Sequence, residues 1–185
     1  MNKTHLIRPA TEKDLDKIIE IAQSRAITNT KVENDSKKGF LIYMMDREEL
    51  IKYQNQNGHY LYVCESNNSI EAYIAACDKS KISTGKFENA IFYNSKDKEI
   101  VDSKFLYGKH VAKKHNASGE IIQDLEEELF TNAKNNGYKH FIAEIAINPT
   151  NEKSINFHTK NGFRIIGEYY DSNKNVNWGI YYKQL

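Results

Sequence analysis

A strand, a helix and a second strand follow one another in the second half of the chain, and this order strongly constrains the fold. Residues 104–112 and 141–147 are rich in apolar and β-forming side chains. Residues 119–136 place Ile, Leu and Ala at helical spacing and end at Asn136-Gly137. Because a helical crossover joins parallel strands, this unit predicts a sheet with helices packed on it.

The rest of the chain adds hairpins and further helices. Strands are predicted over residues 5–8, 60–64, 70–76, 164–170 and 178–183, and helices after Thr11, over 46–55 and over 151–160. Thr11 and Asp14 resemble a capping box, with Asp in place of the usual Glu. The segment 24–43 lacks a clear period and is interpreted as a loop that could include a helical turn. The long polar segment 79–102 is interpreted as a loop. We expect one mixed α/β (α+β) domain over residues 1–185.

Composition excludes several classes of protein. A formal net charge of +1 argues against a dedicated nucleic-acid binder, which must neutralise phosphates. No apolar run reaches the ~20 residues of a membrane span, and the N-terminus lacks the apolar stretch of a secretory signal. Cys64 and Cys77 lie in apolar runs, as expected of buried, reduced thiols in the cytoplasm. The histidines show no zinc-ligand spacing, so no metal is expected.

A candidate anion site lies where residues 113–118 connect the strand to the helix opened by Gly119. The N-terminus of a helix has unpaired N–H groups and a partial positive charge, so a diphosphate is a suitable guest. Lys113 and Lys114 could assist. A single glycine at this place is also compatible with a simple turn.

The segment after residue 150 contains a second motif. Its spacing is carried by Asn151, Ser154, Phe157-His158 and Gly162-Phe163, and residues 7–14 add a matching opening. In these residues the chain resembles the GNAT (Gcn5-related) N-acetyltransferase superfamily, and within it an uncharacterised bacterial subgroup of predicted acetyltransferases. The resemblance implies a mostly antiparallel sheet of about seven strands flanked by about four helices. It also implies acetyl transfer from acetyl-CoA to a primary amine by direct attack.

The resemblance assigns the coenzyme A diphosphate to the turn that opens the second helix: Asn116, Ala117, Ser118, Gly119, Glu120 and Ile121. Only Gly119 fits the family's phosphate-binding pattern. Ile121 brings a branched side chain where the pattern has a small residue, and Glu120 adds a negative charge. The backbone N–H of Val111 is the nearest match to the group that stabilises the oxyanion.

Three further residues receive roles from the resemblance. His158 stands where the family usually has a Tyr that donates a proton to the leaving thiolate, and this role would weaken as pH rises through the histidine's pKa. The alternative is a histidine that only interacts with the C-terminal dipole of its helix. Glu144 could orient a water that deprotonates the amine, or be satisfied by sheet-edge amides. Asn151 could bind the pantetheine arm, cap its own helix, or do both.

The acceptor is expected in the variable segments 24–43 and 79–102, as a small-molecule or peptide amine. Aromatic walls and acids that would attract a cation are Phe40, Tyr43, Phe92, Tyr93, Glu33, Asp35 and Glu88. Two alternatives stay open: a catalytically eroded protein of this fold with a binding or regulatory role, and transfer of a longer acyl group. A homodimer is compatible with such folds, whose last strands often pair across a two-fold axis.

Overall fold

The computed structural model describes residues 5–27 and 36–185, which cluster into two compact units. The first unit comprises the described residues of 1–26, 41–77 and 108–137. The second comprises those of 27–40, 78–107 and 138–185. Within the described residues, no helix is long and apolar enough to cross a membrane.

Strands of the first unit follow the order β1 (Leu6–Pro9), β2 (His59–Ser66), β3 (Ser69–Asp78) and β5 (Leu106–Lys113). β1 pairs antiparallel with β2, and β2 pairs antiparallel with β3. Asn67 and Asn68 form the turn between β2 and β3 with φ of 50° and 58°. Asn tolerates this left-handed region better than most residues, so the Asn pair fixes the predicted hairpin.

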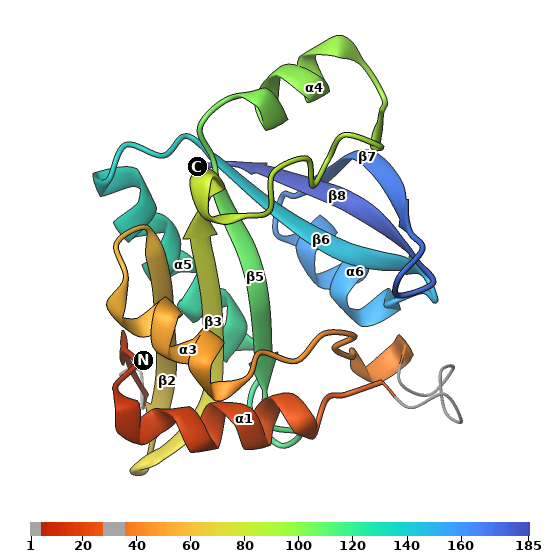
Figure 1. Ribbon diagram of the computed structural model, residues 1–185. Helices are drawn as coiled ribbons and strands as arrows, with labels where there is room; N and C mark the ends of the chain where they lie inside the picture. Colours follow the sequence, from red (N-terminus) through yellow and green to blue (C-terminus); the bar gives the residue numbers. More distant parts are fainter. Residues whose placement is uncertain (1–4, 28–35) are drawn as a thin grey trace. The chain divides into compact units, whose positions relative to one another are not determined.

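Helices of the first unit are η1 (Glu12–Asp14), α1 (Leu15–Gln23), α3 (Arg47–Asn55) and α5 (Glu120–Asn135). The predicted capping box is present: Asp14 accepts a hydrogen bond from the backbone N–H of Thr11 at 2.7 Å. Asp46 caps α3 by accepting from the N–H of Glu49 at 2.8 Å. Figure 1 shows α1 and α3 on one side of the strands and α5 on the other.

The core of the first unit is formed by apolar faces of the strands and helices. Fully buried side chains include Leu15, Ile18, Leu50, Val63, Tyr73, Leu125 and Leu129. Cys64 and Cys77 are free and buried, as predicted, and burial raises the pKa of Cys64 to about 11.

Strands of the second unit follow the order β6 (His140–Asn148), β8 (Val176–Gln184), β7 (Arg164–Asp171) and β4 (Ile91–Phe92), and each neighbouring pair is antiparallel. The unit also contains η2 (Lys79–Lys81), α4 (Ser95–Asp102) and α6 (Glu152–Lys160). α6 ends at Asn161-Gly162, with Gly162 at φ 82°, which is the expected C-terminal signal. The predicted mixed α/β class with mostly antiparallel strands is confirmed.

The interpretation of residues 79–102 as loop was wrong in part, because they include η2, β4 and α4. α4 has only Ile100 and Val101 as large apolar residues, so no amphipathic period marks it. Tertiary contacts hold it instead. Asn94 caps its N-terminus, and the buried carboxylate of Asp97 forms an ion pair with Arg164 of β7 at 2.7 Å.

Candidate active site

The β5–α5 junction is built largely from main-chain contacts. β5 ends at Lys113, and α5 begins at Glu120 after a short turn (Figure 1). The backbone N–H of Lys114 donates to the carbonyl of Glu71 at 2.8 Å, and the Lys113 ammonium donates to the carbonyl of Ala117 at 2.6 Å. The six residues predicted to cradle a diphosphate, 116–121, therefore lie together in one braced turn.

Gly119 leaves space in front of the first turn of α5. A Cβ added there would meet no heavy atom within 4 Å, and its φ of −65° is one that any residue adopts. Ser118 Oγ accepts from the N–H of Glu120 at 3.3 Å, and Glu120 itself is exposed. The Ile121 side chain lies in the core of the unit and is only 6% exposed. Ile121 replaces the small residue of the family's pattern. Because its side chain is buried in the core, it does not fill the space in front of Gly119.

The two lysines near the junction support the turn through different contacts. Lys114 pairs with Glu71 at 2.9 Å and with the hydroxyl of Ser69 at 2.6 Å. Lys113 holds the turn carbonyl of Ala117. The Lys113 charge therefore lies at the turn, where it favours an anion, whereas the Lys114 charge is paired on β3 and braces the loop.

Val111, the predicted donor to the oxyanion, follows a histidine that fixes β5 in place. Both ring nitrogens of His110 are engaged, one with the hydroxyl of Tyr73 at 2.6 Å and the other with the carbonyl of Tyr43 at 2.7 Å. Burial lowers the pKa of His110 to about 4, so the ring is neutral near pH 7. The bracing role of His110 could not be predicted from the sequence, because its partners Tyr73 and Tyr43 lie on distant segments.

Glu144 lies on β6 with a side chain that is 7% exposed. One carboxylate oxygen, Oε2, accepts from the hydroxyl of Tyr107 at 2.7 Å and from the ammonium of Lys86 at 2.9 Å. The other, Oε1, is buried without a hydrogen-bond partner among the described residues. Glu144 is therefore held by side chains rather than by sheet-edge amides, and it keeps unused acceptor capacity.

Asn151 caps α6, which confirms one of its two predicted roles. Its Oδ1 accepts from the N–H of Ser154 at 3.3 Å, and its Nδ2 donates to the carbonyl of Phe40 at 2.9 Å. The residue is 7% exposed. Contact with a pantetheine arm stays a prediction, and it would use the remaining lone pair or N–H of a side chain that is already ordered.

His158 lies in α6 and is 5% exposed. Its Nδ1 donates to the carbonyl of Ser154 at 2.8 Å, and its ring packs edge-on against Phe157 and Phe163. Burial lowers the pKa of His158 to about 4. Near pH 7 the imidazole is therefore neutral, with its proton on Nδ1. A neutral ring has no charge that could interact with the C-terminal dipole of the helix, and its Nε2 carries no proton to donate.

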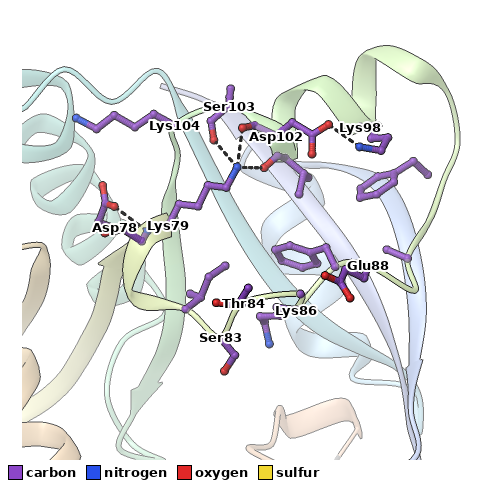
Figure 2. Close-up of a pocket in the computed structure, with 17 residues that line it drawn as sticks. Asp78, Lys79, Ser83, Thr84, Lys86, Glu88, Lys98, Asp102, Ser103 and Lys104 are labelled. Atoms are coloured by element: carbon purple, nitrogen blue, oxygen red, sulfur yellow. Dashed lines mark hydrogen bonds and ion pairs between the residues drawn. The ribbon is translucent and has the colours of Figure 1, made fainter.

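Residues expected around the acceptor are distributed unevenly. Phe92 and Glu88 line a cavity of about 880 Å³ in the second unit (Figure 2). Tyr93 is exposed, Phe40 is buried, and Tyr43 binds Glu49 through its hydroxyl. Glu33 and Asp35 lie outside the described residues.

Sequence reasoning missed the side chains that surround Glu144. Lys86, Tyr107 and Tyr169 come from a loop and two strands, and no motif spacing connects them. Their convergence depends on which strands become neighbours. Within residues 5–27 and 36–185, no group of three His, Cys, Asp or Glu side chains is placed to hold a metal ion.

No protein-family profile and no curated protein matches the sequence. Solved structures do match over nearly the whole chain. An N-acetyltransferase from Staphylococcus aureus has 19% identity and a TM-score of 0.65, and covers 97% of this chain and 98% of its own. A ribosomal-protein-alanine N-acetyltransferase from Brucella melitensis has 20% identity and a TM-score of 0.64, covering 97% and 99%.

A third similar structure is that of Arabidopsis thaliana NAA60 in complex with acetyl-CoA. It has 12% identity and a TM-score of 0.68, and it covers 98% of this chain and 99% of its own. At these identities the likeness establishes the fold. The chain adopts the GNAT fold, as the motif around Asn151 and His158 predicted.

Proposed function

We propose that the chain is an acetyl-CoA-dependent N-acetyltransferase that acts on a primary amine. The observation that carries this proposal is the β5–α5 junction, on a fold shared with N-acetyltransferases. The junction is open at Gly119, and the Ile121 side chain is buried in the core. Main-chain N–H groups at a helix N-terminus suit a diphosphate, and they are present whatever the side chains of the turn.

Each predicted cradle residue has a role in this proposal. The N–H groups of residues 119–121 bind the diphosphate, and that of Glu120 exchanges its long bond to Ser118 Oγ for a phosphate oxygen. Asn116, Ala117 and Ser118 shape the turn that leads to them. The exposed carboxylate of Glu120 weakens this binding by repulsion. The N–H of Val111 donates to the carbonyl oxygen of the acetyl group as negative charge develops there.

Acetyl-CoA supplies a thioester whose carbonyl carbon is attacked by the neutral amine. A primary ammonium must first lose a proton, and Glu144 is the base that we assign to that step, directly or through a water. Its Oε1 is the acceptor with capacity left for this proton. The C–N bond forms first, and the tetrahedral intermediate then expels the thiolate as the C–S bond breaks. The nitrogen loses its second proton to the departing thiolate, directly or through solvent, which gives the amide and the free thiol. The first proton, taken up by Glu144, passes to solvent.

His158 is assigned a positioning role rather than that of the acid. A proton donor must carry its proton on a nitrogen that faces the thiolate, and the Nδ1 proton of His158 is held by Ser154. A charged imidazole would be populated only near pH 4, where the pKa of this buried ring lies. Identical pH–rate profiles for the wild type and His158→Phe would support this assignment.

The acceptor class follows from the same arrangement. Amines of peptides or small molecules both fit a carboxylate such as Glu144, and the Brucella protein named above acts, by its name, on an alanine of a ribosomal protein. A panel should therefore include an N-terminal alanine peptide, a lysine peptide and aliphatic diamines. Acetyl-CoA and a longer acyl-CoA on the same panel separate the two acyl chain lengths.

Thermal unfolding with and without acetyl-CoA tests the cofactor. Ligand at 100 times its Kd stabilises the folded state by about 2.7 kcal/mol, which is an easily measured shift. Thiol release on the amine panel then tests turnover. A shift with turnover supports the enzyme, and absence of any shift contradicts it.

A second candidate function is binding or regulation by a catalytically eroded protein of this fold. The observation that favours it is Glu120, an exposed carboxylate in the first turn of α5, beside the expected phosphates. A thermal shift without turnover on any amine would favour this alternative. Glu120→Gln should then strengthen coenzyme A binding without producing activity.

A further inference from the structure

Lys86 is bound in an aromatic cage closed by a carboxylate. Its Nζ lies 5.3 Å from the ring centre of Tyr107 and 6.0 Å from those of Phe87 and Tyr169. The Glu144 carboxylate completes the site at 2.9 Å. Cations are attracted to the faces of aromatic rings, and the attraction grows when water is excluded. The second unit therefore contains a built site for an ammonium group.

The carboxylate of this site has capacity that Lys86 does not use. Glu144 Oε2 accepts from Lys86 and Tyr107, whereas the buried Oε1 has no partner among the described residues. A buried acceptor without a donor is costly. Burial, the nearby Glu144 charge and a hydrogen bond to Glu144 raise the pKa of Tyr169, so this hydroxyl stays neutral and also interacts with the carboxylate.

Among the described residues, four lysines line the adjoining cavity of about 880 Å³, and Lys86 differs from two of them, Lys79 and Lys98. The fourth, Lys104, also lies over an aromatic ring, that of Tyr138, at 4.3 Å. The Lys79 ammonium donates to three carbonyls, of Val101, Asp102 and Ser103, and so caps α4 (Figure 2). Lys98 pairs with Asp102 along α4. These two contacts stabilise a helix. The contacts of Lys86 instead connect a loop to residues of strands.

The loop that carries Lys86, residues 82–90, is held to itself by turns. Three backbone bonds lie within the segment, from Lys86 to Ser83, from Glu88 to Gly85 and from Ala90 to Phe87, and the N–H of Ile82 at its start donates to Lys79. Withdrawal of Lys86 would leave the paired strands intact. Lys86 and Phe87 line the cavity, whereas Tyr107, Tyr169 and Glu144 do not. The Lys86 side chain is 24% exposed, so another molecule can reach the cage from solvent at this residue.

We propose that the cage of Phe87, Tyr107, Tyr169 and Glu144 recognises a primary ammonium on an unbranched alkyl chain, and that Lys86 is its resident stand-in. The occupant is chemically an n-butylammonium group, so the site is already shaped for one. This inference rests on the proposed function, in which the acceptor is an amine, and it adds the acceptor's chemistry. An entering ammonium displaces Lys86 and donates to Glu144.

Competition with Lys86 makes a prediction that a simple structural ion pair does not. A ligand that must displace an internal group binds with an affinity reduced by the fraction of protein in the open state. Removal of Lys86 should therefore strengthen binding. If Lys86 only stabilises the loop, its removal should leave binding unchanged or weaken it.

The experiment titrates n-butylammonium into the whole protein without coenzyme A, with NMR chemical shifts as the readout. Lys86→Met should bind at least fivefold more tightly than the wild type, and Lys86→Gln serves as a second variant if the first unfolds. Glu144→Gln combined with Lys86→Met should lose this binding. Lys98→Met, which removes another cavity lysine, should behave as the wild type.

Two results would overturn the proposal. In the first, Lys86→Met and Lys86→Gln bind n-butylammonium no more tightly than the wild type does. In the second, 1-butanol binds with the same affinity as n-butylammonium. Failure of the proposed function looks different. Tighter n-butylammonium binding in Lys86→Met without any turnover would remove the transferase and leave the ammonium site. If the protein acetylates an amine but its Lys86 variants gain no affinity for n-butylammonium, the transferase stays and the ammonium site is removed.

Discussion

The β5–α5 junction and the Glu144 cage are both candidate binding sites, but they are built from different parts of the chain. The junction offers main-chain N–H groups in one continuous segment, braced by contacts such as Lys114 to Glu71. The cage offers side chains from a loop and from several strands. A main-chain site tolerates substitution of its side chains, and a side-chain site does not.

This difference has a consequence for how each site would evolve. The junction can lose most of the family's phosphate-binding pattern and keep its N–H groups, provided that Ile121 stays in the core and Gly119 leaves space. The cage binds through its side chains, so no main-chain group takes over when one of them is replaced. Replacement of Glu144 removes the charge that the whole cluster is arranged around.

The largest expected effect comes from Glu144→Gln. Loss of the assigned base should lower kcat by about 10²–10⁴-fold, whereas coenzyme A affinity should not change. Steady-state thiol release and a coenzyme A titration measure the two quantities. Glu127→Gln is the control, because it makes the same change from carboxylate to carboxamide at an exposed residue of α5. An unchanged kcat in Glu144→Gln would remove this residue from the mechanism.

The second effect tests the junction through Gly119→Leu. The backbone there accepts any residue, so the free energy of unfolding should not fall. The added side chain enters the space where the diphosphate is expected and should weaken coenzyme A binding at least tenfold.

Gly137→Ala is the matched control for Gly119→Leu. Gly137 also has nothing within 4 Å of an added Cβ, but its φ is +78°. It should lose about 1 kcal/mol of stability through backbone strain and keep its coenzyme A affinity. Equal coenzyme A affinities in Gly119→Leu and the wild type would contradict the assigned diphosphate site.

The same contrast explains what the sequence could predict. The β5–α5 turn, the capping box at Thr11 and the motif around His158 are local, so their residues lie close together in the sequence. Periodicity and capping rules apply to such segments. The order of elements along the chain followed from these rules, and the GNAT fold followed from the family resemblance of the motif around His158.

The parts that could not be predicted depend on tertiary contacts. α4 has almost no apolar stripe and is held by Arg164 and by the ammonium of Lys79, which are far away in sequence. The cage around Glu144 needs Lys86 and Tyr107 to meet a residue of β6. The protonation of His158 was also unpredictable, because its burial, not its residue type, sets its pKa.

Each unit contains one neutral buried histidine, which gives the third prediction. Burial lowers the pKa of His110 and of His158 to about 4, below the reference value of about 6.5. Between these values the unfolded state binds more protons, so stability is present above pH 6.5 and is lost as pH falls toward 4. The loss should be on the order of 3 kcal/mol for each ring.

Denaturant unfolding from pH 7 to pH 4 measures this loss. His158→Phe cannot bind the proton, so its stability should fall by roughly half as much over the same range. The free energy of unfolding of each protein at lower pH is compared with its own value at pH 7. A slope equal to that of the wild type would mean that His158 does not titrate between the two states.

The smallest expected effect is that of Lys114→Met. Its ion pair with Glu71 is partly exposed, and pairs of this kind contribute about 0–1 kcal/mol. The Lys114 backbone bond to Glu71 remains, so the turn keeps its shape and coenzyme A affinity should fall no more than about threefold. Isothermal titration of coenzyme A measures it. A loss as large as that of Gly119→Leu would show that side-chain charge, rather than main-chain N–H groups, dominates this site, and the contrast with the Glu144 cage would fail.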